Sequence, residues 1–346
     1  MVYLSGLLYN ESQQVFRTVF KLKNRTVLHW FPGHMGKGVK DMQKKLKSVD
    51  CIVEVHDARI PFSGRNPESF QTVSGLRPHI LVYNKRDLAN EDLESVIINK
   101  HKENGFQNIL FTNCKDQKCN GIKRLVPLVQ KQILSSHRYN RSENRDYCLM
   151  VIGVPNVGKS SLINTLRNKN LLKKNAAHVG AVPGITRSVG EKIKISDDPL
   201  IYVLDTPGIL SPKVPSVDVG MKLALCATIP DKEVGIELIA DYLLFWLNKH
   251  SHFGYTDFLG IDNPSDNISE ALSVFAVKNN FTMKVLDCEG KRVLRPNLNL
   301  AAVRFVDAFR RGIFGKFTLD IDEIHSPNIK SSHKHLIYKR VNVIKG

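Results

Sequence analysis

Residues 29–215 alternate short apolar runs with longer amphipathic stretches. Several of the short runs are apolar at successive positions, which is typical of parallel strands covered by helices on both faces. The predicted strands are residues 51–55, 80–83, 108–112, 148–152, 192–195 and 201–204. The predicted helices are residues 37–47, 88–104, 121–135 and 159–168. This alternation predicts a doubly wound α/β domain with a mostly parallel sheet and helices on both faces.

A second pattern begins after Pro215, where apolar positions recur at helical spacing. We expect helices over residues 233–248, 268–277 and 298–311, separated by turn signals such as that at residues 262–266. The last stretch places apolar side chains on one face, which we expect to be core: Leu298, Ala302, Phe305, Phe309 and Ile313. Residues 216–319 are therefore expected to form a smaller, all-helical domain, and the polar residues 137–145 a surface connection within the first domain.

Both ends of the chain are basic. Residues 1–28 hold four basic side chains and one acidic one, and residues 325–346 hold five Lys or Arg and no acid. A basic, acid-poor N-terminal segment is typical of a mitochondrial presequence, and equally of a disordered leader. We expect residues 320–346 to be a flexible basic tail.

The chain of 346 residues carries 50 Lys and Arg against 33 Asp and Glu, a formal net charge of +17. This excess favours an anionic partner, either nucleic acid or a membrane surface, although solubility alone also accounts for it. The longest wholly apolar run, residues 243–247, is far shorter than the roughly 20 residues of a membrane-spanning helix. Six dispersed cysteines without CxxC spacing indicate free thiols, with neither a disulfide framework nor a zinc site.

A glycine-rich segment between a predicted strand and a predicted helix, Gly153 to Ser160, matches the pattern GxxxxGK[ST]. Its glycines let successive backbone N–H groups face a phosphate, and the dipole of the following helix favours negative charge. Lys159 is expected to bridge the β- and γ-phosphates, and the Ser160 hydroxyl to bind Mg²⁺. The expected nucleotide contacts in this loop are Asn156, Val157, Gly158, Lys159, Ser160 and Ser161.

The segment Asn84-Lys85-Arg86-Asp87 follows a predicted strand, at the end where ligands bind in such sheets. Guanine presents two adjacent donors, its N1–H and its 2-amino group, whereas adenine has an acceptor at N1. Asp87 can therefore accept two hydrogen bonds from guanine but would stay unpaired against adenine, at a cost of several kcal/mol. We expect Asn84 to support the loop, the stem of Lys85 to lie along the ring and Arg86 to join the site. A solvated polar turn is the alternative interpretation.

Two further segments suit the γ-phosphate and a metal ion. The segment DTPG at 205–208 ends a predicted strand, so Asp205 is expected to hold Mg²⁺ through water and the Gly208 N–H to contact the γ-phosphate. In the segment PGITR, Thr186 is the expected second hydroxyl ligand of Mg²⁺ in a mobile switch, with an ordinary turn as the alternative. Together these motifs predict a site for GTP or GDP with Mg²⁺.

The order of the motifs is unusual. Ordinary small GTPases have the phosphate loop first and NKxD last, whereas here Asn84 precedes Gly153 by 69 residues. A parallel sheet tolerates this, because its motifs lie on loops at one edge and only their places in space matter. The predicted fold is therefore a circularly permuted P-loop GTPase domain. Since the loop after Gly208 continues into the helical domain, nucleotide state could pass to that domain through the chain itself.

These motifs resemble those of circularly permuted GTPases of ribosome assembly, in particular the members associated with mitochondrial ribosomes. The resemblance runs from about Trp30 to Leu319 and includes WFPGHM, DARIP, NKRD, GVPNVGKSS, PGITR and DTPG. It implies a GTPase, slow until stimulated by the ribosome, that promotes late assembly of the mitochondrial large ribosomal subunit and so supports mitochondrial translation. It also implies rRNA binding by the C-terminal domain, no DNA partner, and a monomer in the matrix or peripherally on the inner membrane.

Hydrolysis needs a substitute for the glutamine that orients water after DxxG in Ras-like enzymes, since that position is Ile209. Asn156 resembles the asparagine that coordinates K⁺ in related GTPases, where the ion supplies positive charge. His34 resembles the histidine proposed as catalytic in this family, and an imidazole suits water positioning or proton transfer near neutral pH. A structural histidine, or one that contacts RNA, is the alternative.

Two other functions stay open. The first is an RNA-binding factor that uses GTP as a structural ligand without hydrolysing it, which Ile209 allows. The second is a membrane-surface factor, which the basic termini allow. Candidate RNA contacts, each of which could equally belong to a solvated face, are Arg304, Arg310, Arg311 and the lysines of residues 37–47 and 169–174.

Overall fold

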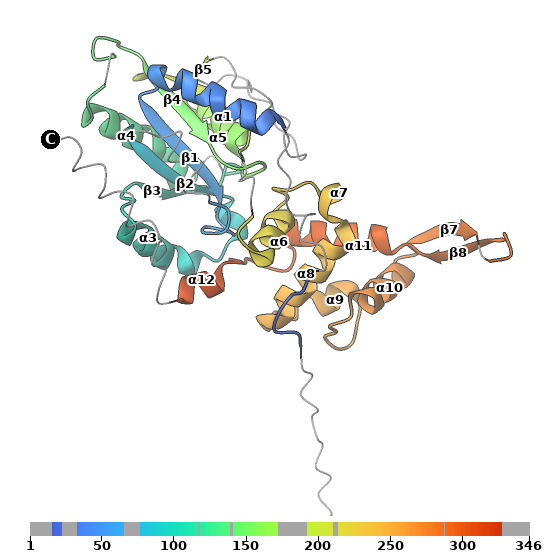
Figure 1. The fold of residues 1–346 in the computed structure, drawn as a ribbon. Coiled ribbons are helices and arrows are strands. Elements are labelled where there is room, and N and C mark those ends of the chain that lie inside the picture. Colours follow the sequence, from blue (N-terminus) through green and yellow to red (C-terminus); the bar gives the residue numbers. More distant parts are fainter. Residues whose placement is uncertain are drawn as a thin grey trace, which may run out of the picture.

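The structure, a computed structural model, describes residues 16–22, 33–65, 77–116, 118–138, 141–171, 192–209, 214–286 and 288–326. These residues form an α/β part built on one large sheet and a predominantly helical part beside it, from which a two-stranded hairpin projects (Figure 1). Across the described ranges, no helix is long and apolar enough to cross a membrane.

All six predicted strands are present in one sheet. They are β1 (Cys51–Asp57), β2 (His79–Asn84), β3 (Ile109–Phe111), β4 (Tyr147–Ile152), β5 (Lys192–Asp197) and β6 (Leu200–Asp205). Their order across the sheet is β3-β2-β1-β4-β6-β5, and only the β5–β6 pair is antiparallel in it. Every residue of the central strand β1 is buried, which requires packing on both faces. The predicted mostly parallel sheet is confirmed.

Helices of the α/β part lie where the amphipathic pattern predicts them. They are α1 (Gly33–Lys45), α3 (Glu94–Glu103), α4 (Asn120–Leu134) and α5 (Lys159–Leu171), with short 3₁₀ turns at Leu46–Ser48, Arg86–Leu88 and Glu91–Leu93. Met42 of α1, Val129 of α4 and Ile163 of α5 are fully buried in the core that contains the strands. The apolar stripe of each helix therefore faces the sheet, which explains the amphipathic pattern.

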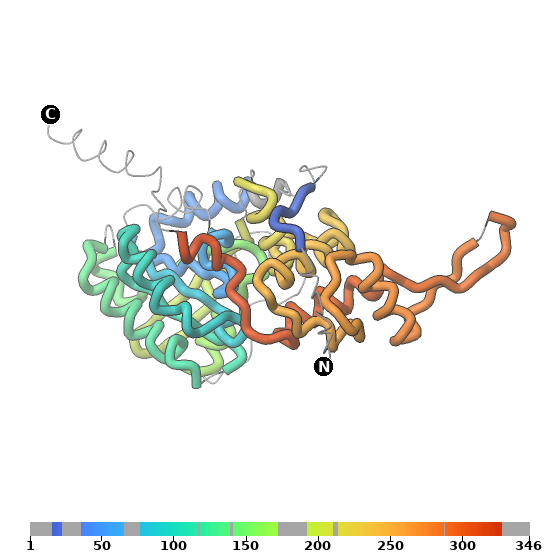
Figure 2. The backbone as a smooth tube through the Cα atoms, turned by 90° about the horizontal axis from the view of Figure 1, so that it is seen from below, coloured from blue at the N-terminus to red at the C-terminus, as the bar shows by residue number. Residues whose placement is uncertain are grey.

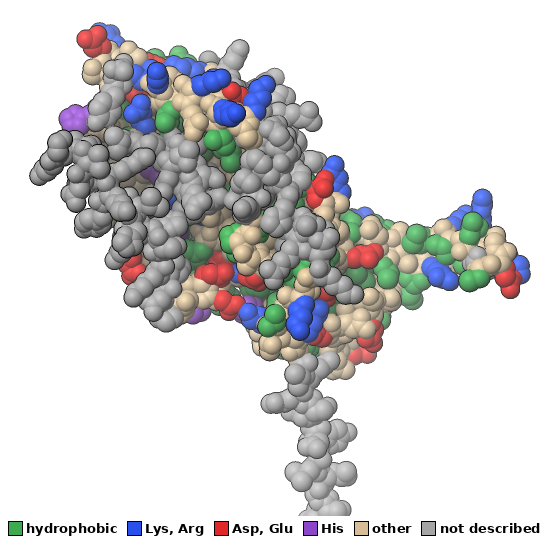
Figure 3. Space-filling model, viewed as in Figure 1, with side chains coloured by type: hydrophobic (Ala, Val, Ile, Leu, Met, Phe, Trp, Pro, Cys, Tyr) green, Lys and Arg blue, Asp and Glu red, His purple; other side chains and the backbone are tan. Residues whose placement is uncertain are grey.

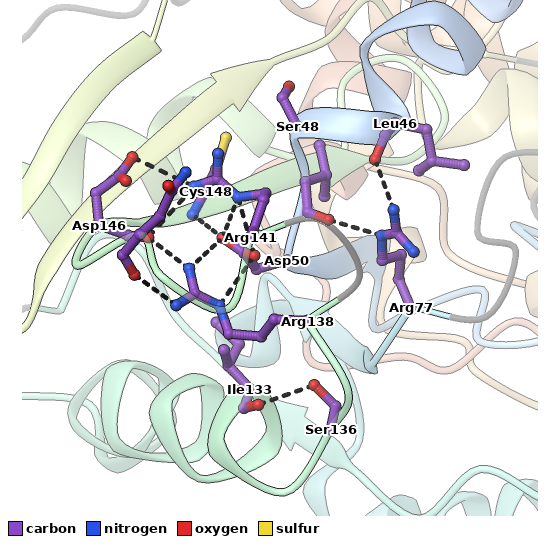
Figure 4. A network of polar contacts seen from close by, with 12 residues as sticks. Leu46, Ser48, Asp50, Arg77, Ile133, Ser136, Arg138, Arg141, Asp146 and Cys148 are labelled. Atoms are coloured by element: carbon purple, nitrogen blue, oxygen red, sulfur yellow. Dashed lines mark hydrogen bonds and ion pairs between the residues drawn. The ribbon is translucent and has the colours of Figure 1, made fainter.

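The polar connection between α4 and β4, expected as a surface segment, is anchored to the sheet by charge (Figure 4). Asp50, which is buried just before β1, accepts hydrogen bonds from the guanidinium groups of Arg138 at 3.2 Å and Arg141 at 3.1 Å. The same carboxylate accepts from the backbone N–H of Cys148 at 2.8 Å. Asp50 thus holds the segment between α4 and β4 against the start of β4. This segment is where the permuted chain order needs a new link between elements.

Removing the Asp50 carboxylate should destabilise the α/β part strongly. Asp50→Ala leaves the Arg138 guanidinium without a carboxylate and Arg141 with Asp146 alone, and the loss of such a buried partner typically costs about 3 kcal/mol or more in free energy of unfolding. Urea unfolding followed by circular dichroism measures this loss. Asp307→Ala is the control, because the Asp307–Arg311 ion pair is exposed and should contribute less than about 1 kcal/mol. Equal losses in the two variants would contradict the anchoring role.

The second part is predominantly helical, as expected. Its helices are α6 (Val217–Leu225), α7 (Asp231–Val234), α8 (Ile236–Lys249), α9 (Tyr255–Leu259), α10 (Ile268–Lys278) and α11 (Leu298–Arg310). Trp246 of α8, Tyr255 of α9 and Phe305 of α11 are buried in its core. Large apolar side chains from helices far apart in the sequence therefore hold this part together.

Two expectations for the second part are wrong. It is not all-helical, because β7 (Thr282–Leu286) and β8 (Arg292–Pro296) form an antiparallel hairpin. Most side chains of the hairpin are exposed, so its strands lack the alternation that marks a half-buried strand. Ile313 was expected in the core but is 59% exposed. The helix ends at Arg310, and Gly312 turns the chain with a φ of 79° before Ile313 is reached.

After α11 the chain returns to the α/β part through residues 316–326, here called the return segment. The backbone N–H of Phe317 donates to the Leu88 carbonyl at 3.0 Å, and that of Leu319 to the Arg59 carbonyl at 2.7 Å. The short helix α12 (Ile321–His325) follows, and its Ile324 packs with apolar residues of the α/β part. The tail expected from residue 320 is therefore folded up to 326, and residues 327–346 lie outside the described residues.

Part of the expected N-terminal leader also belongs to the fold. Residues 16–22 lie on the helical part, where the Arg17 guanidinium pairs with Asp241 at 2.7 Å and with Asp266 at 2.9 Å. The ring of Phe20 meets that of Tyr242 edge-on, with 5.2 Å between centroids. Residues 16–22 of the leader expected over residues 1–28 are therefore packed against the helical part. The other residues of that leader lie outside the described ones.

Candidate nucleotide-binding site

Three motif-bearing segments meet at one edge of the sheet. The parallel register places Asp57 at the end of β1 opposite Asn84 at the end of β2, and Val151 of β4 opposite Asp205 at the end of β6. Because parallel strands end at the same edge, the loops after β2, β4 and β6 converge there. The structure thus brings together the NKRD, phosphate-loop and DTPG segments, although their order in the chain is permuted.

Asn84 makes the contact that joins the NKRD loop to the phosphate loop. Its side-chain nitrogen donates to the Val157 carbonyl at 2.9 Å, across 73 residues of sequence. Its side-chain oxygen accepts from the Thr112 hydroxyl at 3.2 Å. Gly158 has a φ of +97°, and a Cβ there would lie 2.3 Å from the Asn84 nitrogen, so glycine is required at this approach. Asn84 therefore supports both loops, as part of one pocket.

The phosphate loop has the shape of an anion-binding turn. Gly153 adopts a φ of +150°, where a Cβ would lie 2.2 Å from the Val55 carbonyl oxygen, and Asn156 adopts a φ of 59°. Helix α5 begins at Lys159, so its N-terminal dipole and N–H groups face the loop. Val157 is buried beneath the loop and Ser161 is half-buried on α5. This is the strand–loop–helix context that the motif requires.

Lys159 is a buried cation whose ammonium donates to neutral carbonyls, those of Gly153 at 3.1 Å and Val154 at 3.0 Å. Burial lowers the pKa of Lys159 to about 8, and the nearby charge of Asp205 offsets this only in part. A phosphate on the loop would add an anionic partner and favour the charged form of the side chain. The electrostatics of the loop therefore suit a polyphosphate.

A hydroxyl and a carboxylate beside Lys159 suit a hard cation. The Ser160 hydroxyl donates to Oδ2 of Asp205 at 2.9 Å. Oδ1 of Asp205 is buried without a hydrogen-bond partner among the described residues. Burial raises the pKa of Asp205, against the opposing charge of Lys159. Oxygen ligands of this kind fit Mg²⁺, whose binding would remove the cost of the unpaired oxygen. Thr186, the other expected ligand, lies outside the described residues.

The DTPG segment lies against the phosphate loop. A Cβ on Gly208 would lie 2.6 Å from the backbone nitrogen of Pro155, so a glycine is required for this close approach. The backbone N–H of Ile209 donates to the Gly153 carbonyl at 3.1 Å, and its side chain is 2% exposed. Ile209 is therefore a buried apolar residue, without a group that could orient water.

Asp87, the expected reader of guanine, is accessible from a polar pocket. The pocket has a volume of about 320 Å³ and is also lined by Asn113, which follows β3. The Asp87 side chain is 27% exposed, and its Oδ2 lies 3.5 Å from the Lys115 ammonium. The adjacent Cys114 carbonyl accepts a hydrogen bond from Thr165 of α5 at 3.1 Å, which holds this loop to the phosphate-binding helix. A carboxylate placed in this way can accept both donors of guanine.

The residues between Asn84 and Asp87 are held by ion pairs. The Lys85 ammonium lies 2.9 Å from Asp57, a buried carboxylate that Arg59 also contacts, at 2.7 Å. Burial alone would raise the pKa of Asp57, but the charges of Arg59 and Lys85 hold it well below its usual range. Arg86, expected to contact the nucleotide, lines the same pocket as Asp87 and pairs with Glu91 at 2.9 Å. Sequence reasoning gave Asp57 no role, although its place at a strand end within DARIP was a usable signal.

The two residues expected to assist hydrolysis lie in different elements, Asn156 within the phosphate loop and His34 in α1. Asn156 donates its side-chain N–H to the Ala227 carbonyl at 2.8 Å, which connects the phosphate loop to the turn after α6. The backbone of His34 lies in the first turn of α1, and its side chain is outside the described side chains. No sequence pattern could predict the contact with Ala227, because it joins residues that are 71 positions apart and lie in different parts of the molecule.

Comparison with known proteins agrees with this geometry. Residues 148–282 match the family model of the 50S ribosome-binding GTPase. The chain is 54% identical over 310 residues to Mitochondrial GTPase 1 of Aedes aegypti, covering 89% of this chain and 98% of that protein. It is 50% identical over 313 residues to Mitochondrial ribosome-associated GTPase 1 of Mus musculus, covering 89% of this chain and 95% of that one.

The chain belongs to the family of mitochondrial ribosome-associated GTPases. Membership makes it a GTP-binding protein with GTPase activity, and the motifs of this activity are those gathered at the edge of the sheet. A crystal structure of GNP-bound YlqF from T. maritima is also similar, with a TM-score of 0.49 and 24% identity, over 81% of this chain and 95% of that one.

Asp87→Asn should change which nucleotide the protein prefers. An amide offers a donor where the carboxylate accepts, so it no longer matches both guanine donors but does match xanthine, which has an acceptor in place of the 2-amino group. Titration with fluorescent nucleotides should show GDP affinity falling about a hundredfold and XDP affinity rising. Asp116→Asn is the control, since Asp116 lines the same pocket and should leave both affinities unchanged. An unaltered preference in Asp87→Asn would contradict the assigned base contact.

The lowered pKa of Lys159 predicts proton uptake on nucleotide binding. Phosphates around the ammonium must raise its pKa from about 8, so affinity is highest below pH 8 and falls as pH rises beyond that value. Calorimetric titration with GDP in two buffers of different ionisation enthalpy measures the uptake. We expect roughly half a proton or more per GDP near about pH 8.5 and much less near about pH 7. Equal uptake at both pH values would show that Lys159 does not respond to the phosphates.

Proposed function

We propose that the chain is a GTP-hydrolysing switch that binds the mitochondrial large ribosomal subunit, promotes its late assembly and so supports mitochondrial translation. The hydrogen bond between Asn84 and Val157 carries this proposal, because it unites the base-reading and phosphate-binding loops. The match to the 50S ribosome-binding GTPase model and the names of the relatives support the ribosomal partner. The net charge of +17 supports rRNA as the surface contacted.

In the proposed bound state, the base and the phosphates are held by different loops. Asp87 accepts the two guanine donors, and Lys159 with the N-terminus of α5 binds the β- and γ-phosphates. Ser160, Asp205 (through water) and Thr186 would hold Mg²⁺, which when bound neutralises charge that develops on the phosphate oxygens. The buried, unpartnered oxygen of Asp205 supports this assignment.

Hydrolysis transfers the γ-phosphoryl group to water. A bond forms between the water oxygen and the γ-phosphorus, and the bond from that phosphorus to the bridging oxygen breaks, leaving GDP and phosphate. The Gly208 N–H would hold a γ-phosphate oxygen, Asn156 would hold K⁺ by its side-chain oxygen, and His34 would position the water. Because Ile209 has no polar group for that task, basal turnover should be slow and should rise on the large subunit.

Single-turnover hydrolysis with and without large subunits tests this mechanism. We expect slow hydrolysis by the chain alone, and stimulation by subunits that His34→Ala removes without loss of GTP binding. Replacing K⁺ by Na⁺ should slow the stimulated reaction in the wild type but not in Asn156→Gly, a substitution that fits the positive φ at this position. A stimulated rate that responds to neither change would refute the roles of His34 and Asn156.

The second candidate is an RNA-binding factor that needs GTP only as a structural ligand. The buried Ile209, in place of a water-orienting residue, favours it. Copurification with large-subunit precursors separates the two candidates. A switch should associate more tightly with a non-hydrolysable GTP analogue than with GDP and should release phosphate on mature subunits. A structural ligand would give equal association with GTP and its analogue, and no phosphate release.

We place the protein in the mitochondrial matrix, as a monomer without a DNA partner that also contacts the inner membrane peripherally. The relatives are mitochondrial by name, which supports the compartment. Pelleting with anionic liposomes at low and high salt tests the membrane contact, because exposed basic contacts weaken as salt screens them. Absence of pelleting at low salt would remove the membrane from the proposal.

We further propose that any import presequence ends before Phe16. Cleavage after Arg17 would remove that residue and leave Asp241 and Asp266 without the guanidinium that they share at 2.7 and 2.9 Å. Mass spectrometry of the protein isolated from mitochondria should find an N-terminus at or before Phe16. A mature N-terminus after Arg17 would contradict this limit.

A further inference from the structure

The β7–β8 hairpin is an arm that extends away from the rest of the molecule (Figure 1; Figure 2). Its two strands are paired along their whole length. Its base is fixed to the helical part, because the Asn297 N–H donates to the Phe281 carbonyl at 2.8 Å. The Phe281 ring also meets that of Phe275 edge-on, with 5.6 Å between centroids. The arm is therefore an ordered projection with an anchored base.

Both faces of the arm are open. Four of the five positions in each strand are exposed, and Figure 3 shows apolar and basic side chains mixed along it. Leu286 is 68% exposed, Leu294 66% and Met283 43%. A two-stranded hairpin open to water on both sides is only marginally stable. Exposed large apolar side chains that gather on one surface mark a place where a partner binds.

The charge of the arm indicates the class of that partner. Residues 282–296 include four Lys or Arg and two Asp or Glu. Near the tip, Lys291 pairs with Glu289 at 2.8 Å. The other three basic side chains of the arm form no ion pair within the described ranges. These are Lys284, Arg292 and Arg295. Exposed cations without intramolecular anions favour a polyanion as the partner.

Apolar and basic side chains alternate on one face of the arm. The register places Lys284 opposite Leu294 and Leu286 opposite Arg292, so the four side chains share a face in a checkered arrangement. Residues 282–296 contain no aromatic side chain on which an unstacked base could stack. Cations can contact phosphates and leucines can cover the ribose edges of a helical backbone. Double-helical RNA therefore fits this face better than single-stranded RNA.

Of the basic residues expected as RNA contacts around α11, Arg304 and Arg311 are exposed, whereas Arg310 is occupied within the fold. Arg310 pairs with Asp231 at 2.6 Å and also donates to carbonyls at the end of α6, so it holds the helical part together. Arg311 pairs with Asp307 at 2.8 Å. Basic side chains also gather over α1 in Figure 3, on the α/β part, and the exposed lysines there are Lys37, Lys40, Lys44 and Lys47. The arm differs from these surfaces because its exposed cations and leucines alternate on one projecting face.

We propose that the β7–β8 hairpin docks on a double-helical segment of rRNA in the large subunit. Lys284 and Arg292 contact phosphates, and Leu286 and Leu294 pack on the ribose edges of the minor groove, whereas Arg295 lies on the opposite face of the arm. That the partner is rRNA rests on the proposed function. What is new is that the hairpin is the surface that binds it and that the RNA bound there is double-helical. Since the arm lies on the helical part, it reaches RNA while the sheet edge stays open to nucleotide.

Variants of the full chain test the arm on purified mitochondrial large subunits and on protein-free large-subunit rRNA, each over a range of salt. One variant removes the two cations of the docking face: Lys284→Gln and Arg292→Gln. A charge-matched control removes two exposed cations, one from α3 and one from α4: Lys102→Gln and Lys123→Gln. A third variant replaces residues 282–296 by Gly-Gly, which Phe281 and Asn297 can still close at the base.

We expect the cation variant to lose about tenfold or more in affinity for both targets near physiological salt. Its plot of log affinity against log salt should be shallower by about 1.5, since each of the two lost phosphate contacts removes roughly 0.7–0.9 from the slope. The arm deletion should do the same, and the control should keep the wild-type slope. An RNA duplex should compete with rRNA better than poly(U) does. GDP binding should be unchanged in all variants.

Wild-type affinity of both arm variants for both targets would overturn the proposal. Unchanged binding to free rRNA with weakened binding to subunits would also overturn it, because the arm would then contact a ribosomal protein. Better competition by poly(U) would refute the double-helical partner. Failure of the unmodified chain to bind large subunits would instead count against the proposed function, and it is distinguished from failure of the arm by the wild-type and control measurements.

Discussion

Asn84 holds the phosphate loop by its hydrogen bond to Val157, and the nucleotide site depends on that contact at the parallel edge of the sheet. Parallel strands deliver their following loops to one edge, whatever the order in which the chain visits them. Permutation therefore changes the connections between strands but not the pocket. It does require a stable closure between α4 and β4, and Asp50 provides one by collecting two guanidinium groups and a backbone N–H.

The same edge touches the helical part on two sides. On the phosphate side, Asn156 donates to the turn after α6, toward which the DTPG segment also leads. On the base side, Lys85 contacts Asp57, Asp57 contacts Arg59, and the Arg59 guanidinium lies 5.6 Å from the ring centre of Phe309 on α11. A nucleotide that shifts either loop would therefore alter contacts with the helical part, and on the base side these contacts include α11, which follows the hairpin arm.

Sequence patterns predict the strands and the pocket motifs because these depend on local features, such as apolar runs bounded by glycine-rich turns. They do not predict which carboxylate a basic side chain will meet when that partner is distant in the fold. Arg310 has the sequence context of an RNA contact, yet it pairs with Asp231. The hairpin and the return segment have no clear periodicity, since the first is exposed on both faces and the second is held by long-range backbone hydrogen bonds.

The joint between the two parts includes a buried cluster of charges beside the shared apolar core, which restricts how it can move. Lys222 of α6 is 1% exposed, and its ammonium contacts Asp320 at 3.3 Å and Glu323 at 2.9 Å in the return segment. Burial alone would lower the pKa of Lys222, but these carboxylates, with Asp218, raise it above its usual value. Such directional contacts resist the gradual repacking that an apolar core tolerates. A movement of α6 must therefore also move the return segment. The backbone of that segment is hydrogen-bonded to the Arg59 carbonyl, close to the base-reading loop. The phosphate and base sides of the site are linked through these contacts.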